Sequence, residues 1–261
     1  MIPRRIAEHV RDHNWFAVAI DFVIVVVGVF IGLQVQDWNT ARQARARAES
    51  YSTRLTDDLR YEAWHWEYLI AYYKDVRENA ERALAAMADG SALSEEQFVI
   101  SAYRASQYYF NNTRRSTYDE MVATGDIGLI ADQKLRRTAL EFFTNPVIDV
   151  ATREAMNSEY RGIFRRRMPA DLQHALLTSC GDRYVEPGDF THIVGSINYD
   201  CSVDMPAEKI TAAAATLRED ADFLPALRLR FADLETAITN LEAYNPELLA
   251  NLRAIAKQPA P

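Results

Sequence analysis

One acidic residue inside an otherwise apolar run could serve several chemical roles. Asp21 lies within residues 16–35, where it is one of only two residues that are neither apolar nor glycine. An acid at such a place can carry protons, make a polar contact with another membrane subunit, or reach the lipid headgroups. On a helix, Asp21 shares one face with Gly28, Gly32 and Gln36. Because glycines four positions apart let two helices approach closely, this face is predicted to pack against a partner helix or a second copy.

The other reactive side chains form no familiar catalytic or metal-binding motif. The five histidines and two cysteines include no Cys-x-x-Cys pair, so a conventional zinc site is not expected. The sequence has no Gly-x-Ser-x-Gly elbow, phosphate loop or dinucleotide fingerprint. We therefore expect a protein that is not an enzyme and uses no cofactor. A membrane-bound hydrolase built from dispersed residues is a distant alternative.

The two cysteines bear on the cellular compartment. Cys180 and Cys201 lie 21 positions apart in one loop-like stretch. This arrangement favours a disulfide, which requires an oxidising compartment; two free buried thiols in the cytosol are the alternative. Arginines flank the apolar run on both sides, so charge does not decide the orientation. We expect a bacterial inner-membrane protein whose N-terminus is cytoplasmic and whose bulk is periplasmic.

The apolar run has the length of a membrane anchor. As a helix, its 20 residues span about 30 Å. Trp15 and Trp38 flank it, as aromatic side chains do at both interfaces of a bilayer. A cleaved signal peptide is the competing interpretation, but the run is long for one and does not end in a small-x-small cleavage site. The sequence thus predicts a lipid bilayer as a partner, with residues 1–14 cytoplasmic, 15–37 transmembrane and 38–257 periplasmic.

Bulk composition describes an ordinary globular part beyond this anchor. The 261 residues are 49% hydrophobic and 25% charged, which is enough to bury a core. The net charge is −8, and no long basic run lies outside the membrane flanks, so nucleic acid is not an expected partner. Residues 165–167 are a short arginine run. We expect it to be a solvated helix end, with contact to lipid or to an acidic partner as the alternative.

Periodicity predicts helices throughout. Residues 38–87 contain neither proline nor glycine, and apolar residues recur every three or four positions, so the anchor should continue as one helix to about residue 89. A capping box at Ser94, another at Thr117, a C-terminal glycine at Gly125 and an N-cap at Asp132 mark further helix ends. The further helices are predicted over residues 98–110, 117–124, 133–143, 147–168, 170–177, 208–217, 222–243 and 247–256.

The predicted fold is an all-α helical bundle that continues from a single N-terminal transmembrane helix. Residues 180–205 form its one irregular, disulfide-pinned loop, with short β pieces possible at 183–185 and 193–194. Residues 258–261 should be a disordered tail. Six tyrosines and tryptophans in residues 61–73 cover too many helix faces for one core stripe. This density of rings suggests contact of some of them with a partner or a ligand, but a bundle core with a few exposed rings is the favoured interpretation.

Two stretches of the sequence resemble motifs of a known protein family. Residues 21–39 read DFVIVVVGVFIGLQVQDWN, and residues 117–130 read TYDEMVATGDIGLI. Together they resemble a family of bacterial single-pass membrane proteins catalogued only as a domain of unknown function. Asp21 and Asp119 stand where that family usually has glutamate, and Gly32 stands where alanine is common. The resemblance covers about the first 145 residues and implies a membrane topology and a helical domain, but no reaction.

These observations favour a non-catalytic accessory, scaffold or assembly subunit of a larger membrane complex. Its partners would be other membrane subunits, or a second copy bound through the Gly28 and Gly32 face. Two alternatives stay open: a sensor-like periplasmic ligand-binding protein, and a stator-like proton-coupled subunit that uses Asp21.

Overall fold

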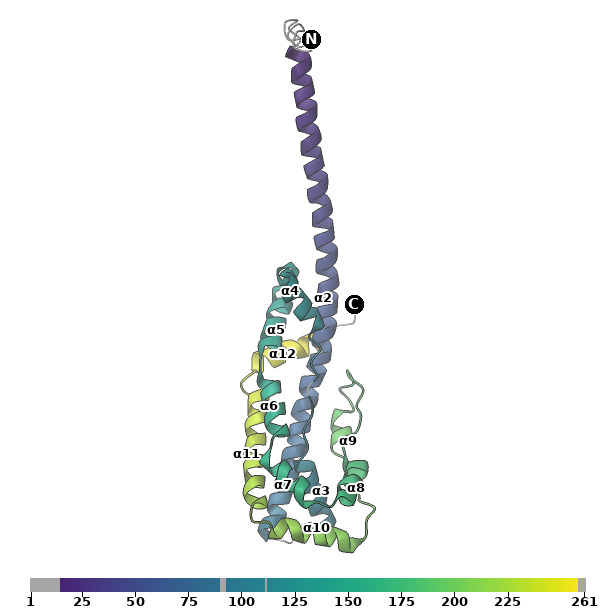
Figure 1. Ribbon diagram of the computed structural model, residues 1–261, viewed down its shortest axis with the longest axis vertical. Helices are drawn as coiled ribbons and strands as arrows, with labels where there is room; N and C mark the ends of the chain where they lie inside the picture. The colour runs from purple at the N-terminus through teal and green to yellow at the C-terminus, as the bar shows by residue number, and fades with distance from the viewer. Residues whose placement is uncertain (1–14, 90–92, 111, 258–261) are drawn as a thin grey trace, which may run out of the picture.

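The computed structural model describes residues 15–89, 93–110 and 112–257, which fold into helices joined by turns and loops, with no strand among them (Figure 1). The prediction of an all-α fold is confirmed. The predicted cytoplasmic segment 1–14 and the predicted tail 258–261 lie outside the described residues. The elements are α2 (Trp15–Asp89), α3 (Glu95–Ala105), α4 (Ser116–Thr124), the 3₁₀ helix η1 (Asp126–Leu129), α5 (Gln133–Thr144), α6 (Val147–Met156), α7 (Glu159–Arg167), α8 (Ala170–Cys180), α9 (Ile193–Ile197), α10 (Ala207–Glu219), α11 (Phe223–Glu242) and α12 (Pro246–Ala256).

Helix α2 is the axis of the molecule. Its 75 residues run without a break from the apolar segment into the domain, as the absence of proline and glycine after Gly32 predicts. Its N-terminal part extends alone beyond every other element, and its C-terminal part lies within the bundle (Figure 1). There it packs chiefly against α3, α11 and α12, and also against α4, α5 and α9. One helix therefore both carries the apolar segment and supplies the centre of the core.

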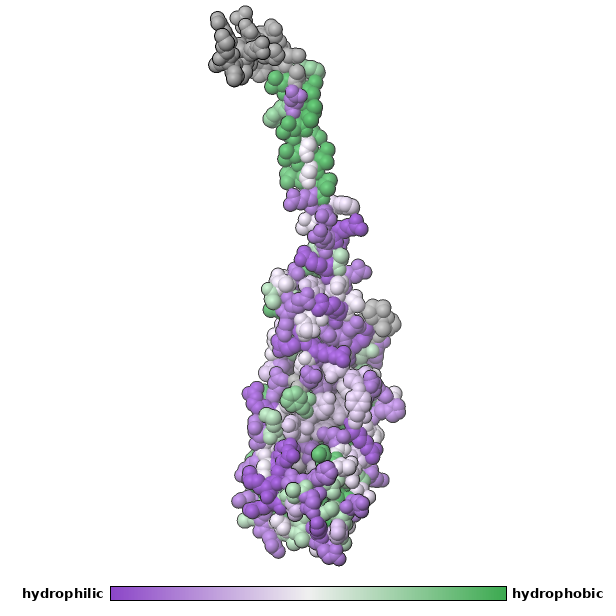
Figure 2. All heavy atoms as spheres, turned by 45° about the vertical axis from the view of Figure 1, so that its right-hand side comes forward, coloured by the Kyte–Doolittle hydropathy of each residue, from purple (hydrophilic) through white to green (hydrophobic). Residues whose placement is uncertain are grey.

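The apolar segment of α2 is uncovered. Figure 2 shows it as a band of hydrophobic surface above a largely hydrophilic domain. From Val18 the helix has the length and apolar composition of a membrane span, and the most apolar stretch has none of its residues buried within the chain. A soluble core helix would bury such a stretch, whereas lipid would cover it. The chain thus carries one candidate membrane span among its described residues.

The aromatic segment of α2 turns inward. Trp64, Trp66, Tyr68, Tyr72 and Tyr73 are buried in the domain. For these five rings, burial supports the interpretation of a bundle core. The physical reason is that helices surround α2 on several sides, so the helix has no single core stripe. The remaining ring, Tyr61, is half-buried.

Local signals correctly located three helix ends. Ser94 forms the predicted capping box with Gln97, and Asp132 caps α5 by accepting from the backbone N–H groups of Lys134 and Leu135. Gly125 ends α4 in the left-handed conformation with φ 75°, which glycine adopts without strain. The second predicted capping box is wrong. Helix α4 begins at Ser116, and its N-cap makes no side-chain hydrogen bond.

Two of the predicted helices have clearly different boundaries in the structure. Helix α3 ends at Ala105 instead of continuing to residue 110, because side chains from other helices bind the carbonyl groups at its end. The predicted helix over 147–168 is two helices, α6 and α7, with the break after Met156. Beyond the break, Tyr160 is buried and donates from its hydroxyl to the Ala102 carbonyl at 2.8 Å, a contact that fixes the direction of α7.

The possible β pieces in the irregular loop are absent from the described chain. Residues 183–185 pair with no strand, and Ile193 and Val194 begin the short helix α9. Since a strand needs a neighbouring strand to accept its backbone hydrogen bonds, an isolated β piece has nothing to pair with in this helical surrounding.

Candidate functional site

The predicted packing face lies on the uncovered part of α2. Asp21, Gly28, Gly32 and Gln36 are all exposed within the chain. A Cβ added at either glycine would meet no atom within 4 Å. This face is therefore free for a helix from another subunit or a second copy.

Of the two tryptophans that flank the apolar segment, the structure describes the side chain of one. Trp15 begins α2, and its side chain lies outside the described residues. Trp38 is 65% exposed, and the Arg42 guanidinium lies 5.9 Å from its ring centroid. A ring beside a cation suits the boundary between hydrocarbon and headgroups.

The second motif, residues 117–130, lies against α2 where that helix enters the domain. Glu120 accepts hydrogen bonds from the Tyr51 hydroxyl at 3.1 Å and from the Arg54 guanidinium at 2.6 Å. Arg47 lies 3.8 Å from the Asp126 carboxylate. The second motif therefore lies at the end of the domain nearest the apolar segment, which contains the first motif (Figure 1).

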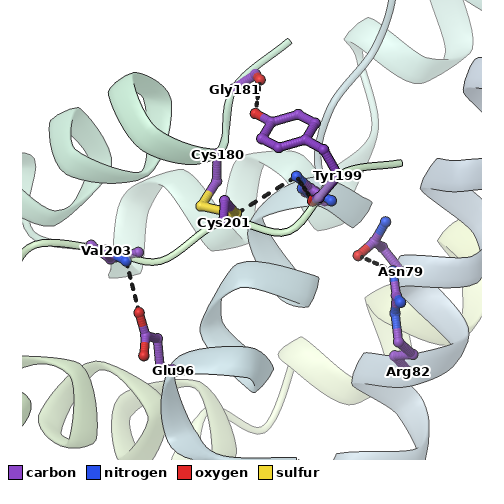
Figure 3. The surroundings of a disulfide bond; sticks show 9 residues. Asn79, Arg82, Glu96, Cys180, Gly181, Tyr199, Cys201 and Val203 are labelled. Atoms are coloured by element: carbon purple, nitrogen blue, oxygen red, sulfur yellow. Dashed lines mark hydrogen bonds between the residues drawn. A yellow bond between two sulfur atoms is a disulfide. The ribbon is translucent and has the colours of Figure 1, made fainter. Parts of the chain in front are cut away.

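Cys180 and Cys201 form the predicted disulfide, with a Cα–Cα distance of 5.5 Å (Figure 3). The alternative of two free thiols is wrong. Cys180 is buried at the end of α8, and the bond joins it to the irregular loop. Hydrogen bonds from other helices also hold the loop. The Glu96 carboxylate accepts from the Val203 N–H at 2.7 Å, and the Trp64 indole N–H donates to the Asp189 carbonyl at 3.0 Å.

A buried arginine links the disulfide to α3. Arg104 is 7% exposed and donates from Nη2 to the Tyr199 carbonyl at 2.9 Å. The same atom lies 3.6 Å from Cys201 Sγ, and the guanidinium lies over the Tyr199 ring at 4.4 Å. The part of the chain that the structure describes gives Arg104 no carboxylate within salt-bridge distance. A buried cation of this kind depends on carbonyl and ring partners for its charge.

Beside Arg104, α2 contributes a buried acid. Asp75 accepts from the Asn79 side-chain amide at 3.1 Å, and Asn79 in turn accepts from Arg82 at 2.8 Å (the latter contact is drawn in Figure 3). The other carboxylate oxygen, Oδ1, is buried without a hydrogen-bond partner. Burial raises the pKa of Asp75 to about 6, against the opposing effect of Arg104 and Arg82. This acid gains or loses a proton near neutral pH.

Tyr72 completes the wall of this site. Its hydroxyl donates to Asp182 Oδ2 at 2.9 Å across 110 positions of sequence. Burial, with the carboxylate of Asp182, raises the pKa of Tyr72 well above its ordinary value, so the hydroxyl stays a donor. A cavity of about 160 Å³ lies next to these groups, lined in part by Asn79, Arg82 and Asp200. The site offers donors and acceptors for a polar molecule but no activated nucleophile.

One hydroxyl, one histidine and one carboxylate do meet elsewhere, but not as a catalytic triad. Thr191 Oγ1 lies 3.0 Å and Asp189 Oδ2 lies 2.5 Å from the same atom, Nδ1 of His192. A triad requires the carboxylate on one ring nitrogen and the nucleophile on the other. All three residues belong to one exposed turn, where hydrogen bonds from Thr191 and His192 lower the pKa of Asp189 to about 2. The described residues also contain no group of three or more metal-binding side chains.

The pH dependence of stability tests the buried acid. The native pKa of Asp75 lies above the ordinary 3.8, so between about pH 4 and pH 6 the folded state binds more protons than the unfolded state. Stability should therefore fall as pH rises through this window, by about 1–3 kcal/mol from this group. Asp75→Asn should not show that part of the fall when melting temperatures are compared at pH 4.5 and pH 7.5. Glu49→Gln, an exposed acid on α2, should keep the wild-type slope; equal slopes in all three proteins would contradict the assignment.

The sequence pointed to the disulfide and to the uncovered face, but not to Asp75, Arg104 or Asp182. A partial signal existed for Asp75 and Asn79, which are polar and four apart beside the core positions Val76 and Ala80. Arg104 and Asp182 offer no such signal, because their partners lie about a hundred positions away.

Comparisons of the chain with protein-family models, with curated proteins and with solved structures find no match. The resemblance carried by residues 21–39 and 117–130 therefore stays a prediction.

Proposed function

We propose that residues 16–35 of α2 anchor the chain in a bacterial inner membrane and that the helical domain lies in the periplasm. There it serves as a non-catalytic accessory or scaffold subunit of a larger membrane complex. The observation that carries the proposal is the continuity of α2, which joins an uncovered apolar segment to the centre of the core without a break. A rigid connection of this kind suits a protein that holds its domain at a set place relative to a membrane partner. The Cys180–Cys201 disulfide supports the oxidising compartment.

The location is tested by fractionation and by a reporter. The full chain should stay in the membrane pellet after alkaline carbonate extraction, because its apolar segment is as long as a bilayer core. A reporter fused after the last residue should be active only if it works outside the cytoplasm. On a non-reducing gel, dithiothreitol should abolish a mobility shift that depends on Cys180 and Cys201. A reporter active only in the cytoplasm, together with reduced cysteines, would overturn the proposed topology.

The partner is tested on the glycine face. Gly32→Leu should weaken association with a partner subunit or a second copy by about tenfold, since a larger side chain keeps two backbones apart. The substitution removes no contact within the chain, because the space around Gly32 is open. Val27→Leu, placed about 140° away around the helix, is the matched control. The measurement is affinity purification in a mild detergent with quantitative mass spectrometry. Equal recovery of partners with both variants would exclude this face as the contact.

Asp21→Asn separates the accessory subunit from the stator-like alternative. An amide retains the size and hydrogen bonding of the side chain but cannot carry a proton. A polar contact or a headgroup position should therefore tolerate the change in both assembly and phenotype. A proton-carrying role predicts normal assembly with loss of activity, and that outcome would replace the proposal with the stator-like function.

A further inference from the structure

A second polar cavity lies between the end of α3 and helices α7 and α8. It has a volume of about 260 Å³, and its walls include Ser106, Arg161, Phe164, Arg165, His174 and Leu177. This cavity is separate from the site around Asp75. A smaller cavity is lined by Asp75, and Gln107 is the one residue that lines both. Volumes near this size suit small molecules better than drug-sized ones.

The charge in this cavity is one-sided. Arg161 and Arg165 lie one turn apart on α7, and no carboxylate is among the lining residues. Neither guanidinium has an ion pair with any residue that the structure describes. Burial, and then the neighbouring Arg165, lower the pKa of Arg161. The two like charges thus lie together, and no carboxylate among the described residues is in ion-pair contact with either of them.

Arg161 is held in place for an incoming ligand. Its Nη1 donates to the Ser106 carbonyl at 2.8 Å, and its guanidinium lies over the Tyr108 ring at 4.6 Å. A guanidinium has five N–H donors in a planar fork, so one carbonyl leaves most of them available. The charge of Arg161 opposes the rise that burial causes in the pKa of Asp182, and the carboxylate of Asp182 already accepts from the Tyr72 hydroxyl.

The cavity also has an apolar wall. Phe164 is buried beneath it, whereas Leu177 is 61% exposed, which is high for a leucine on a domain helix. Apolar surface beside paired cations fits an anion that carries an apolar body.

We propose that this cavity binds a small organic anion, a carboxylate or a phosphate ester attached to an apolar group. The anionic oxygens accept from Arg161 and Arg165, and the apolar group packs on Leu177 above the buried Phe164. This site goes beyond the proposed function as a subunit and does not depend on the membrane topology.

Isothermal titration calorimetry of the full chain in an uncharged detergent tests the site. The probes are benzoate, phenyl phosphate, inorganic phosphate and chloride at constant ionic strength, with empty micelles as the blank. Arg165→Gln is the main variant, because Arg165 is exposed and makes no ion pair. Arg166→Gln is the matched control: it has the same charge change, on the same helix, at an exposed residue outside the cavity lining.

We expect benzoate and phenyl phosphate to bind the wild type and Arg166→Gln about equally. Arg165→Gln should bind both about tenfold more weakly, the loss typical of one charge-assisted hydrogen bond. Equal melting temperatures of the two variants establish that folding is intact. Equal binding by both variants, or no binding beyond that of chloride, would overturn the site. If inorganic phosphate binds as tightly as phenyl phosphate, the apolar part of the proposal is wrong.

Discussion

Trp66→Ala is expected to lower the free energy of unfolding by about 3–5 kcal/mol, the range for removing a buried tryptophan. The indole is fully buried, packs 5.9 Å from the Phe142 ring and donates to the Leu241 carbonyl at 3.2 Å. Its loss leaves a cavity between α2, α5 and α11 and removes the donor from a buried carbonyl. For a domain of this size the melting temperature should fall by about 6–20 °C.

Thermal unfolding of the full chain in detergent, followed by circular dichroism, measures this effect. Trp38→Ala is the matched control, since Trp38 lies on the same helix but outside the core; it should leave the melting temperature unchanged within about 1 °C. Both variants should remain in the membrane pellet, because the proposed insertion depends on residues 16–35 and not on the core. An unchanged melting temperature for Trp66→Ala would contradict the placement of α2 at the centre of the bundle.

Removal of the disulfide is expected to cost about 3 kcal/mol, because the bond closes a loop of 21 residues and restricts the unfolded chain. Cys180→Ala combined with Cys201→Ala should lower the melting temperature by about 6–12 °C. Dithiothreitol should lower the melting temperature of the wild type to the same value and leave the double variant unchanged. A variant as stable as the oxidised wild type would show that the other contacts of the loop, at Glu96 and Trp64, hold it without the bond.

Elements set by neighbouring residues were predictable from the sequence. The caps at Ser94 and Asp132 and the glycine at Gly125 act over two to four positions, so a local pattern reveals them. The end of α3 is different. Arg230, from α11, donates to the carbonyl groups of Ala105 and Gln107. No pattern within α3 shows that an arginine 125 positions away binds its last turn.

The aromatic segment illustrates a second limit. Periodicity analysis assumes that a helix buries one face, so rings on several faces indicate a partner. In this fold the helices of the chain itself enclose α2 and bury Trp64 and Tyr73 alike. Local patterns could not predict the polar sites either. Arg104 contacts Tyr199, and Tyr72 contacts Asp182, only after the loop folds back onto α2.

The unbroken course of α2 also sets distances. Between Val35 and Arg47, whose side chain lies near Asp126 of η1, the helix rises about 18 Å, so the domain begins that far from the end of the apolar segment. In the anchored arrangement that we propose, another membrane subunit must project this far from the lipid to touch the domain. From Val35 to Asp89 the helix is about 80 Å long and acts as a lever: the usual 20° tilt of a membrane helix swings its far end by about 30 Å. Helices α7 and α8, with their arginine-lined cavity, lie toward that end and would undergo most of the displacement (Figure 1).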